Sequence, residues 1–176
     1  SNLITGTAIS ANSPNCAFDQ SNGTGMPLYN VSFGNTNTTQ DIGQSFKVST
    51  SSPLNKIQLY IKQTGNASNA TVKIMNNSND KPGSTVLASG TLSASSVSTN
   101  YGWINISFNT NPTLVAGATY WLVIDGGTDK NKYYIIGASN GGYNNGAGII
   151  GQLDGTWTNT VPSGLDYYFN IYLGGE

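Results

Sequence analysis

Carboxylates are the side chains with which this protein could do acid–base chemistry, because the 176-residue sequence contains no His and no Arg. Catalysis by imidazole, a Ser-His-Asp triad and an imidazole-bound zinc are therefore excluded. Glycosidases use two carboxylates instead. Asp125 and Asp129 flank a Gly-Gly-Thr turn, and Asp154 and Asp166 follow in later turns. Because turn aspartates usually accept hydrogen bonds from their own backbone, the pattern favours a protein that is not an enzyme.

Two acidic loops raise the question of a calcium site, since hard cations take several oxygen ligands from one flexible loop. They are residues 19–23 (Asp-Gln-Ser-Asn-Gly) and residues 125–129 (Asp-Gly-Gly-Thr-Asp). Neither completes an EF-hand loop, and the bidentate Glu that closes such a loop is absent. We expect ordinary turns and no cofactor, with calcium as the alternative.

Aromatic side chains are the second group that could recognise a ligand, because their faces stack on sugar rings and they are also enriched in subunit interfaces. The face opposite the expected core carries Tyr60, Trp103, Trp121, Tyr168 and Tyr172. For these five, a place in the core is a further alternative. Two more aromatics lie in loops beside Asn-rich segments, and we take them as candidate sugar-binding residues: Trp157 and Tyr143.

Seven sites have the Asn-X-Ser/Thr pattern of N-glycosylation, against about five expected by chance in so Asn-, Ser- and Thr-rich a sequence. The candidate acceptors are Asn22, Asn30, Asn37, Asn66, Asn69, Asn76 and Asn105. Glycosylation is thus a hypothesis for a protein displayed on a cell surface.

The charge content limits the partners. Charged residues make up 9% of the sequence, against about 25% in ordinary soluble domains. The net charge is −1 and no basic run occurs, so binding of nucleic acid is not expected. The sequence contains no run of about 18 apolar residues, so insertion into a membrane is not predicted. Cys16 is the only cysteine, so no disulfide forms within the chain. With no His, we expect stability to be nearly constant between about pH 5 and 9.

Short strands are the elements that position these residues, because the apolar residues recur with period two. The alternating runs lie at residues 46–48, 57–62, 71–75, 103–108, 121–124, 132–138 and 167–173. Alternate side chains of a strand point to opposite faces, so each run offers one apolar face to a core. Gly- and Asn-rich turns separate the runs, and no helical periodicity occurs. The sequence therefore predicts an all-β fold, an antiparallel jelly-roll-like β-sandwich.

The first forty residues differ from the rest because they show few alternations. We expect residues 1–40 to form an N-terminal strand or arm with a long loop, and residues 41–176 to form the sandwich domain. Residues 3–10 could be a strand that pairs with its own sheet or with a neighbouring subunit. The expected interface residues of this segment are Leu3, Ile4, Ala8 and Ile9. Lysine on an edge strand hinders pairing with another chain, and the seven Lys of the sequence are too few to protect most of the expected sheet edges.

Several segments then appear in an order that resembles a known family. They are GQSFKV from residue 43, LNKIQLYIKQTGN from 54, ATVKIMNN from 70, KPGSTVLASGTLSASSVSTNYGWINISFN from 81, LVAGATYWLVIDGG from 114 and DYYFNIYLGG from 166. Residues 40–174 resemble the choice-of-anchor R type extracellular β-sandwich module of bacterial and archaeal surface proteins. The resemblance implies an exported, non-catalytic domain of a cell surface or appendage. It supplies no catalytic or ligand residues.

These observations predict a non-catalytic extracellular structural protein, a subunit of a surface layer, pilus or filament that self-associates or joins other surface proteins. Exchange of the N-terminal strand is the expected means of assembly. The alternative is a binding module, either an adhesin or a carbohydrate-binding β-sandwich, in which Trp157 and Tyr143 contact a glycan.

Overall fold

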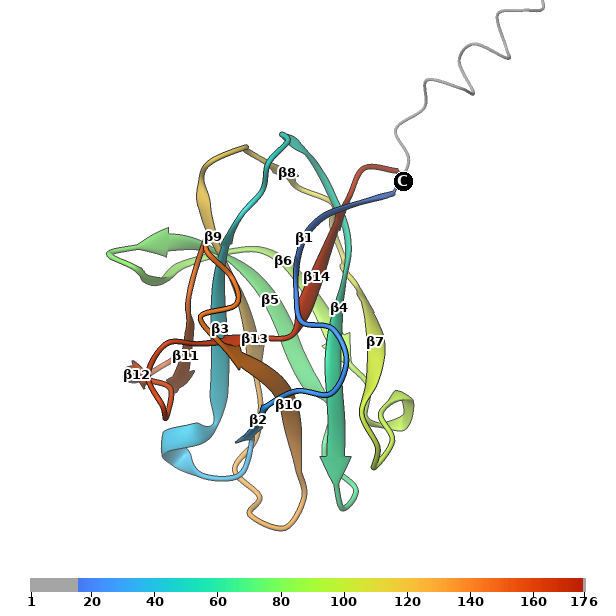
Figure 1. Cartoon of the computed structure of the whole chain (residues 1–176), viewed down its shortest axis with the longest axis vertical. Helices are drawn as coiled ribbons and strands as arrows, with labels where there is room; N and C mark the ends of the chain where they lie inside the picture. Colours follow the sequence, from blue (N-terminus) through green and yellow to red (C-terminus); the bar gives the residue numbers. More distant parts are fainter. Residues whose placement is uncertain (1–15, 176) are drawn as a thin grey trace, which may run out of the picture.

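Two antiparallel β-sheets packed face to face form the fold of residues 16–175, the part of the chain that this computed structural model describes (Figure 1). Within that range the chain forms fourteen strands and two short 3-10 helices, without an α-helix. The predicted all-β antiparallel sandwich is confirmed. The jelly-roll pattern of connections stays a prediction.

The strands are short, as the sequence predicts, except for two long ones in the middle of the chain. Their bounds are β1 Ala17–Asn22, β2 Tyr29–Phe33, β3 Asp41–Lys47, β4 Ser52–Thr64, β5 Ala70–Ser78, β6 Lys81–Leu92, β7 Gly102–Ser107, β8 Thr113–Leu114, β9 Thr119–Asp125, β10 Tyr133–Asn140, β11 Gly148–Gly151, β12 Trp157–Asn159, β13 Leu165–Tyr167 and β14 Phe169–Leu173. The 3-10 helices are η1 (Asn37–Thr39) and η2 (Ala94–Ser96).

The long strand β4 organises the first sheet, which has eight strands in the order β1-β14-β4-β10-β13, with β2 also on β10 and with β7 and β8 also on β4. Ile57 of β4 pairs with Ile171 of β14 and with Ile106 of β7, so these two strands lie on opposite edges of β4. The second sheet has six strands in the order β12-β11-β3-β9-β5-β6.

The core between the sheets follows the predicted alternation. Ile57, Leu59 and Ile61 of β4 are fully buried, whereas the alternate residues Tyr60 and Lys62 are half-exposed on the outer face. The apolar residues of β14 and β5 join the same core. Burying apolar side chains on one face of each sheet supplies the main stabilisation of such a sandwich.

Strands β3 and β9 depart from the alternation because both of their faces are buried. Residues 41–46 of β3 and residues 121–124 of β9 have no exposed member. The outward side chains Trp121 and Val123 pack with Met75 and Ile149 in a second apolar cluster, on the outside of the six-stranded sheet. A central strand covered on both sides loses the polar alternation of a half-buried strand.

The segment predicted to form an N-terminal strand or arm with a long loop contributes two strands to the sandwich, so the predicted boundary at residue 40 is wrong for the described residues. Strand β1 pairs with β14, and β2 pairs with β10. A register shift at Asp19 interrupts the pairing of β1, and a bulge of this kind breaks the period-two pattern on which the prediction depends. Leu3, Ile4, Ala8 and Ile9 lie outside the described residues.

Candidate functional site

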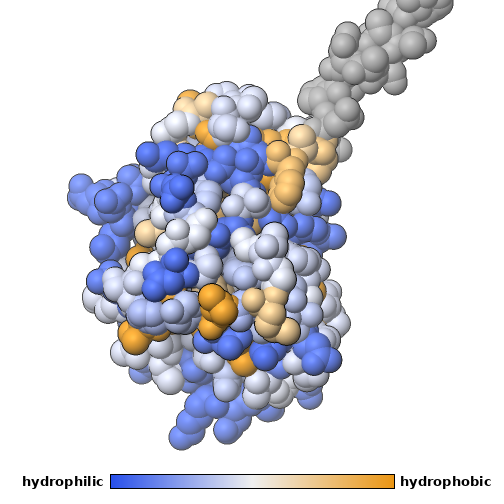
Figure 2. All heavy atoms as spheres, viewed as in Figure 1, coloured by the Kyte–Doolittle hydropathy of each residue, from blue (hydrophilic) through white to orange (hydrophobic). Residues whose placement is uncertain are grey.

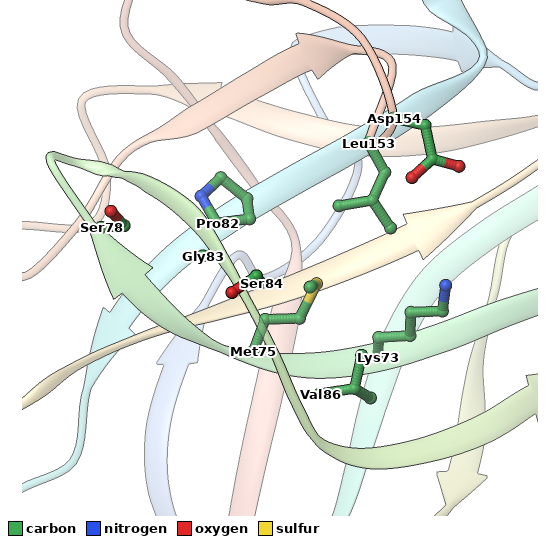
Figure 3. Close-up of a pocket in the computed structure, with 9 residues that line it drawn as sticks. All are labelled: Lys73, Met75, Ser78, Pro82, Gly83, Ser84, Val86, Leu153 and Asp154. Carbon is green, nitrogen blue, oxygen red and sulfur yellow. The ribbon is translucent and has the colours of Figure 1, made fainter.

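A cleft lies on the outer face of the six-stranded sheet and consists of two adjoining hollows. The first hollow has a volume of about 550 Å³. Strands β5 and β6 and the turn between β11 and β12 line it with Lys73, Met75, Ser78, Pro82, Gly83, Ser84, Val86, Leu153 and Asp154 (Figure 3). Lys73 and Asp154 supply its charges, while Met75, Val86 and Leu153 supply an apolar wall.

The second hollow, of about 420 Å³, adjoins the first because Met75 and Trp121 are paired neighbours on β5 and β9. Amide and charged side chains dominate its lining. They come from β3, the β5–β6 turn, the β10–β11 loop and β12 and include Lys47, Asp80, Lys81, Asn144, Asn145 and Asn159. The cleft thus has an apolar centre and a polar rim.

The floor of the cleft is the second apolar cluster. Trp121 and Val123 of β9 and Ile149 of β11 are buried in it, and the half-buried Leu153 and Trp157 pack against it. The indole Nε1 of Trp121 donates a 2.9 Å hydrogen bond to Asn77 Oδ1. The predicted Trp157 therefore packs against the buried cluster that contains Trp121, although it does not itself line either hollow.

The hairpin that carries Trp157 depends on a glycine. Gly151 ends β11 with φ of 153° and pairs with Trp157 of β12. A Cβ atom at this position would overlap the carbonyl of Thr156. Because only glycine readily adopts this conformation and admits so close a strand, Gly151 allows β12 to turn back and pair with β11 at the edge of the sheet.

Two carboxylates beside the first hollow hold the loops around it. Asp41 is 1% exposed, and its two oxygens accept hydrogen bonds from the backbone N–H of Gly126 and of Leu153, each at 2.8 Å. Asp125 forms a 3.2 Å ion pair with Lys73. Asp41 also contacts Asp125, and its burial together with that negative neighbour raises the pKa of Asp41 to about 6.

The raised pKa contradicts the expectation of constant stability between about pH 5 and 9, because Asp41 titrates within that range. Burial also raises the pKa of Asp166, which accepts hydrogen bonds from the backbone of Tyr143 and the side chain of Gln44. Composition alone does not predict this, because desolvation depends on which aspartates the fold encloses.

Tyr143 is not an exposed loop residue, so its predicted part in a shared glycan site with Trp157 is wrong. It is 7% exposed, and its ring meets that of Phe169 edge to face at 5.1 Å between centroids. Its hydroxyl donates to Gln20 Oε1 at 2.6 Å, and burial raises its pKa to about 12. The ring stabilises the core and ties the β10–β11 loop to β1.

The aromatic set predicted to face outward divides between the two sheets. Trp121 is buried in the six-stranded sheet, whereas the other four lie on the outer face of the eight-stranded sheet. There Tyr60 stacks on Tyr101 at 5.0 Å between ring centroids, and the Lys62 ammonium lies over the Tyr101 ring at 4.6 Å from its centroid. The rings thus largely cover one another. Trp103 remains 37% exposed.

Six of the seven sequon asparagines are exposed or half-buried, but Asn22 is buried. Its Nδ2 donates to Ser139 Oγ and to the carbonyls of Asp166 and Tyr167. An amide nitrogen that is enclosed and bonded in this way is inaccessible to a glycosylating enzyme, so the Asn22 prediction is wrong. Asn30, Asn37, Asn66, Asn69, Asn76 and Asn105 stay candidates.

Two further aspartates, one in each loop considered for calcium, have structural partners. Asp19 accepts hydrogen bonds from the backbone N–H and the hydroxyl of Ser49, and Asp129 accepts one from the N–H of Asn131 within its own turn. Among residues 16–175, no group of three or more Asp, Glu, Cys or His side chains is arranged to hold a metal ion. The two loops weighed for calcium therefore gain no support as ligand clusters.

Comparisons with known proteins add no assignment: no family model matches the chain, and no curated protein matches it. The resemblance to the choice-of-anchor R type therefore stays a proposal. In the part of the chain that the structure describes, no helix has the length and apolar character needed to cross a membrane.

Alternation alone misses the floor of the cleft, because it assigns Trp121 to an exposed face. The sequence does indicate that both faces of this strand are buried, because residues 121–124 (Trp-Leu-Val-Ile) are apolar without interruption. Such a run is typical of a strand buried on both faces. The rim residues Asn145 and Asn159 carry no comparable signal.

Proposed function

We propose that this chain is a non-catalytic extracellular β-sandwich module that binds carbohydrate in the cleft, as an adhesin or a carbohydrate-binding domain does. One observation carries the proposal: the cleft combines an apolar floor, which includes Trp121 and is packed from one side by Trp157, with a rim of amide side chains. Sugars present apolar C–H faces and a periphery of hydroxyl groups, and they fit a site of this composition.

Side chains of the rim would orient a bound oligosaccharide through hydrogen bonds. The side chains of Asn144, Asn145 and Asn159 offer both donors and acceptors around the second hollow. Lys47 and Lys81 add donors near the same hollow, and Asp80 adds an acceptor. A neutral or weakly acidic oligosaccharide is therefore the favoured ligand class, since the cations there outnumber the acid.

A binding role rather than a catalytic one agrees with the state of the carboxylates. Asp41 is buried and bonded to two backbone amides, and Asp125 is paired with Lys73. Glycoside hydrolysis needs one acid and one separate carboxylate on either side of the bond to be cleaved. Two acids in contact, with their oxygens already bonded to the protein, do not offer that arrangement.

Placement at a cell surface is supported by three features of the sequence. These are the resemblance to an exported surface module, the low content of charged residues and the accessible sequons. In the view of Figure 2 the apolar residues of the surface form small patches separated by hydrophilic ones.

A glycan array followed by calorimetry tests the proposal. Trp157→Ala is expected to weaken binding about tenfold, because it removes an aromatic ring that packs against the floor of the cleft, and Asn159→Ala is expected to weaken binding without disturbing the floor. Trp103→Ala, on the other sheet, is the matched control and should leave affinity unchanged. An array without hits, or equal losses in the two tryptophan variants, would contradict the assignment.

A second role, as a subunit of a surface layer, pilus or filament, is favoured by the edge strand β7. No charged residue occurs between Lys81 and Asp125, and β7 lies within this stretch. Uncharged edges accept strands from other chains. Deletion of residues 1–12 should abolish polymers seen by electron microscopy, whereas unchanged polymers would refute strand exchange.

A further inference from the structure

The free edges of the two sheets differ in how well they are protected against an added strand. The eight-stranded sheet ends at β7 on one side of β4 and at β1 with β2 on the other, and the six-stranded sheet ends at β6 and β12. Strands β8 and β13 also end the first sheet but have only two and three residues. Proteins protect edges with charge, proline, bulges, short strands or covering segments. Each edge of residues 16–175 can be compared on these terms.

The edges of the six-stranded sheet are protected. Strand β6 begins with Lys81 and Pro82, and two register shifts interrupt its pairing with β5. Farther along, the backbone N–H of Asn109 donates to the carbonyl of Ser89 at 2.8 Å, so a neighbouring segment covers that part of β6. Strand β12 is only three residues long.

The edge formed by β1 and β2 is interrupted. The two strands share that side of the sheet but are separated by residues 23–28, where Pro27 packs against Gly137. Strand β1 also carries the register shift at Asp19, whose charged side chain bonds to Ser49. An incoming strand would not find a continuous row of backbone groups there.

Strand β7 has none of these protections over residues 102–106. It contains no charge, no proline and no bulge, and it pairs with β4 in unbroken register. Its last residue, Ser107, approaches Gly90 of β6, so the uncovered part is the stretch before it. Trp103 and Asn105 are exposed on the outer face beside this edge.

The segment of the chain that precedes the described residues could supply a strand for the free edge of β7. Fifteen residues precede Cys16, and extended they span about 50 Å. Of these, residues 3–10 (Leu-Ile-Thr-Gly-Thr-Ala-Ile-Ser) are uncharged and rich in β-branched residues. Within one chain, residues 11–16 would have to cross β14 and β4, and the shortest route leaves the segment parallel to β7, which is the weaker pairing. A second copy is free of that constraint.

We propose that residues 3–10 of a second copy add to the free edge of β7 as an antiparallel strand. The proposal rests on the second role given above and names its acceptor edge. Donor and acceptor are different parts of the chain, so the contact is heterologous and repeats from copy to copy. The expected product is an open filament rather than a closed dimer.

A matched pair of asparagine variants of the full chain tests the acceptor edge. Asn105 on β7 and Asn30 on β2 are both exposed and both accept one side-chain hydrogen bond on the outer face, from Gln58 and from Tyr101 respectively. Asn105→Lys places a charge beside the proposed acceptor, and Asn30→Lys places one on the opposite edge. Sedimentation and negative-stain electron microscopy report assembly, and circular dichroism reports folding.

We expect the unchanged chain to form filaments and Asn105→Lys to raise the concentration needed for assembly at least about tenfold. Asn30→Lys should assemble as the unchanged chain does, and an excess of a synthetic peptide of residues 1–12 should shorten the filaments. A chain that stays monomeric, equal effects of the two variants, or no effect of the peptide would overturn the proposal. Glycan binding, measured on the same samples, reports the cleft separately.

Discussion

Replacing Asp41 with Asn is expected to flatten the pH dependence of the free energy of unfolding between about pH 5 and 7. Asp41 is buried beside Asp125, and this environment raises its pKa from 3.8 to about 6. The unfolded chain lacks that environment. Between the two pKa values the native state therefore binds more protons than the unfolded state, and stability falls as the pH rises through that interval.

The magnitude follows from the size of the shift. A difference from 3.8 to about 6 in the pKa of Asp41 corresponds to about 3 kcal/mol in full. Roughly 1 kcal/mol of that loss falls between about pH 5 and 7, because the rest occurs below pH 5. For a chain of this size, 1 kcal/mol moves the melting temperature by about 2–4 °C. Asp166, whose pKa is also raised by burial, acts in the same direction.

The assay is chemical or thermal unfolding of the unchanged chain, Asp41→Asn and Asp80→Asn at a series of pH values. Asp80 is exposed in the β5–β6 turn and provides the charge-matched control. Asn at position 41 can accept only one of the two backbone hydrogen bonds, so its absolute stability is not the readout; the slope is. An unchanged slope in Asp41→Asn, or a flat profile in the unchanged chain, would show that the reasoning about Asp41 is wrong.

Three further substitutions test the packing. Leu59→Ala, in the centre of β4, should lower the free energy of unfolding in guanidinium chloride by about 2–5 kcal/mol, since Leu59 is fully buried; a loss below 1 kcal/mol would contradict the core assignment. Gly90→Ala should cost about 1–3 kcal/mol, because its methyl group would overlap the carbonyl of Ser107; no loss would mean that β6 and β7 are not closely packed. Tyr101→Phe removes the hydroxyl that donates to Asn30 at 2.5 Å and should cost about 1 kcal/mol in the same assay. A neutral result there would show that this bond adds nothing.

The strands of the sandwich could be predicted from the alternation of apolar and polar residues wherever one face of a strand is exposed to solvent. Along β4 the alternation assigns Ile57, Leu59 and Ile61 to the core and Lys62 to the outside, and the structure agrees. Period two in the sequence translates directly into two faces of a sheet, so no long-range knowledge is needed. The same reasoning fails at Trp121, because a segment about 30 residues later in the chain, at Leu153 and Trp157, covers the outer face.

The candidate site was only partly accessible to sequence reasoning. Trp157 packs against the cluster that forms the floor of the cleft, but Tyr143, which also lies in a loop with Asn and Gly nearby, is enclosed against Phe169 and Gln20. Composition does not separate the two. Likewise, seven sequons look alike in one dimension, and only the bonds of the Asn22 amide to β13 remove it.

What the amino-acid order determined by itself was the set of strands with a clear alternation, the exclusion of imidazole and arginine chemistry, and the scarcity of charge along edges such as β7. What the tertiary structure decided was which surfaces meet: the tryptophan floor of the cleft, the contact of Asp41 with Asp125, and the entry of β1 and β2 into the first sheet. The reason is physical. The face of the sheet to which a side chain points follows from its position in the alternating strand. Its burial and desolvation depend on segments that only the folded chain brings together.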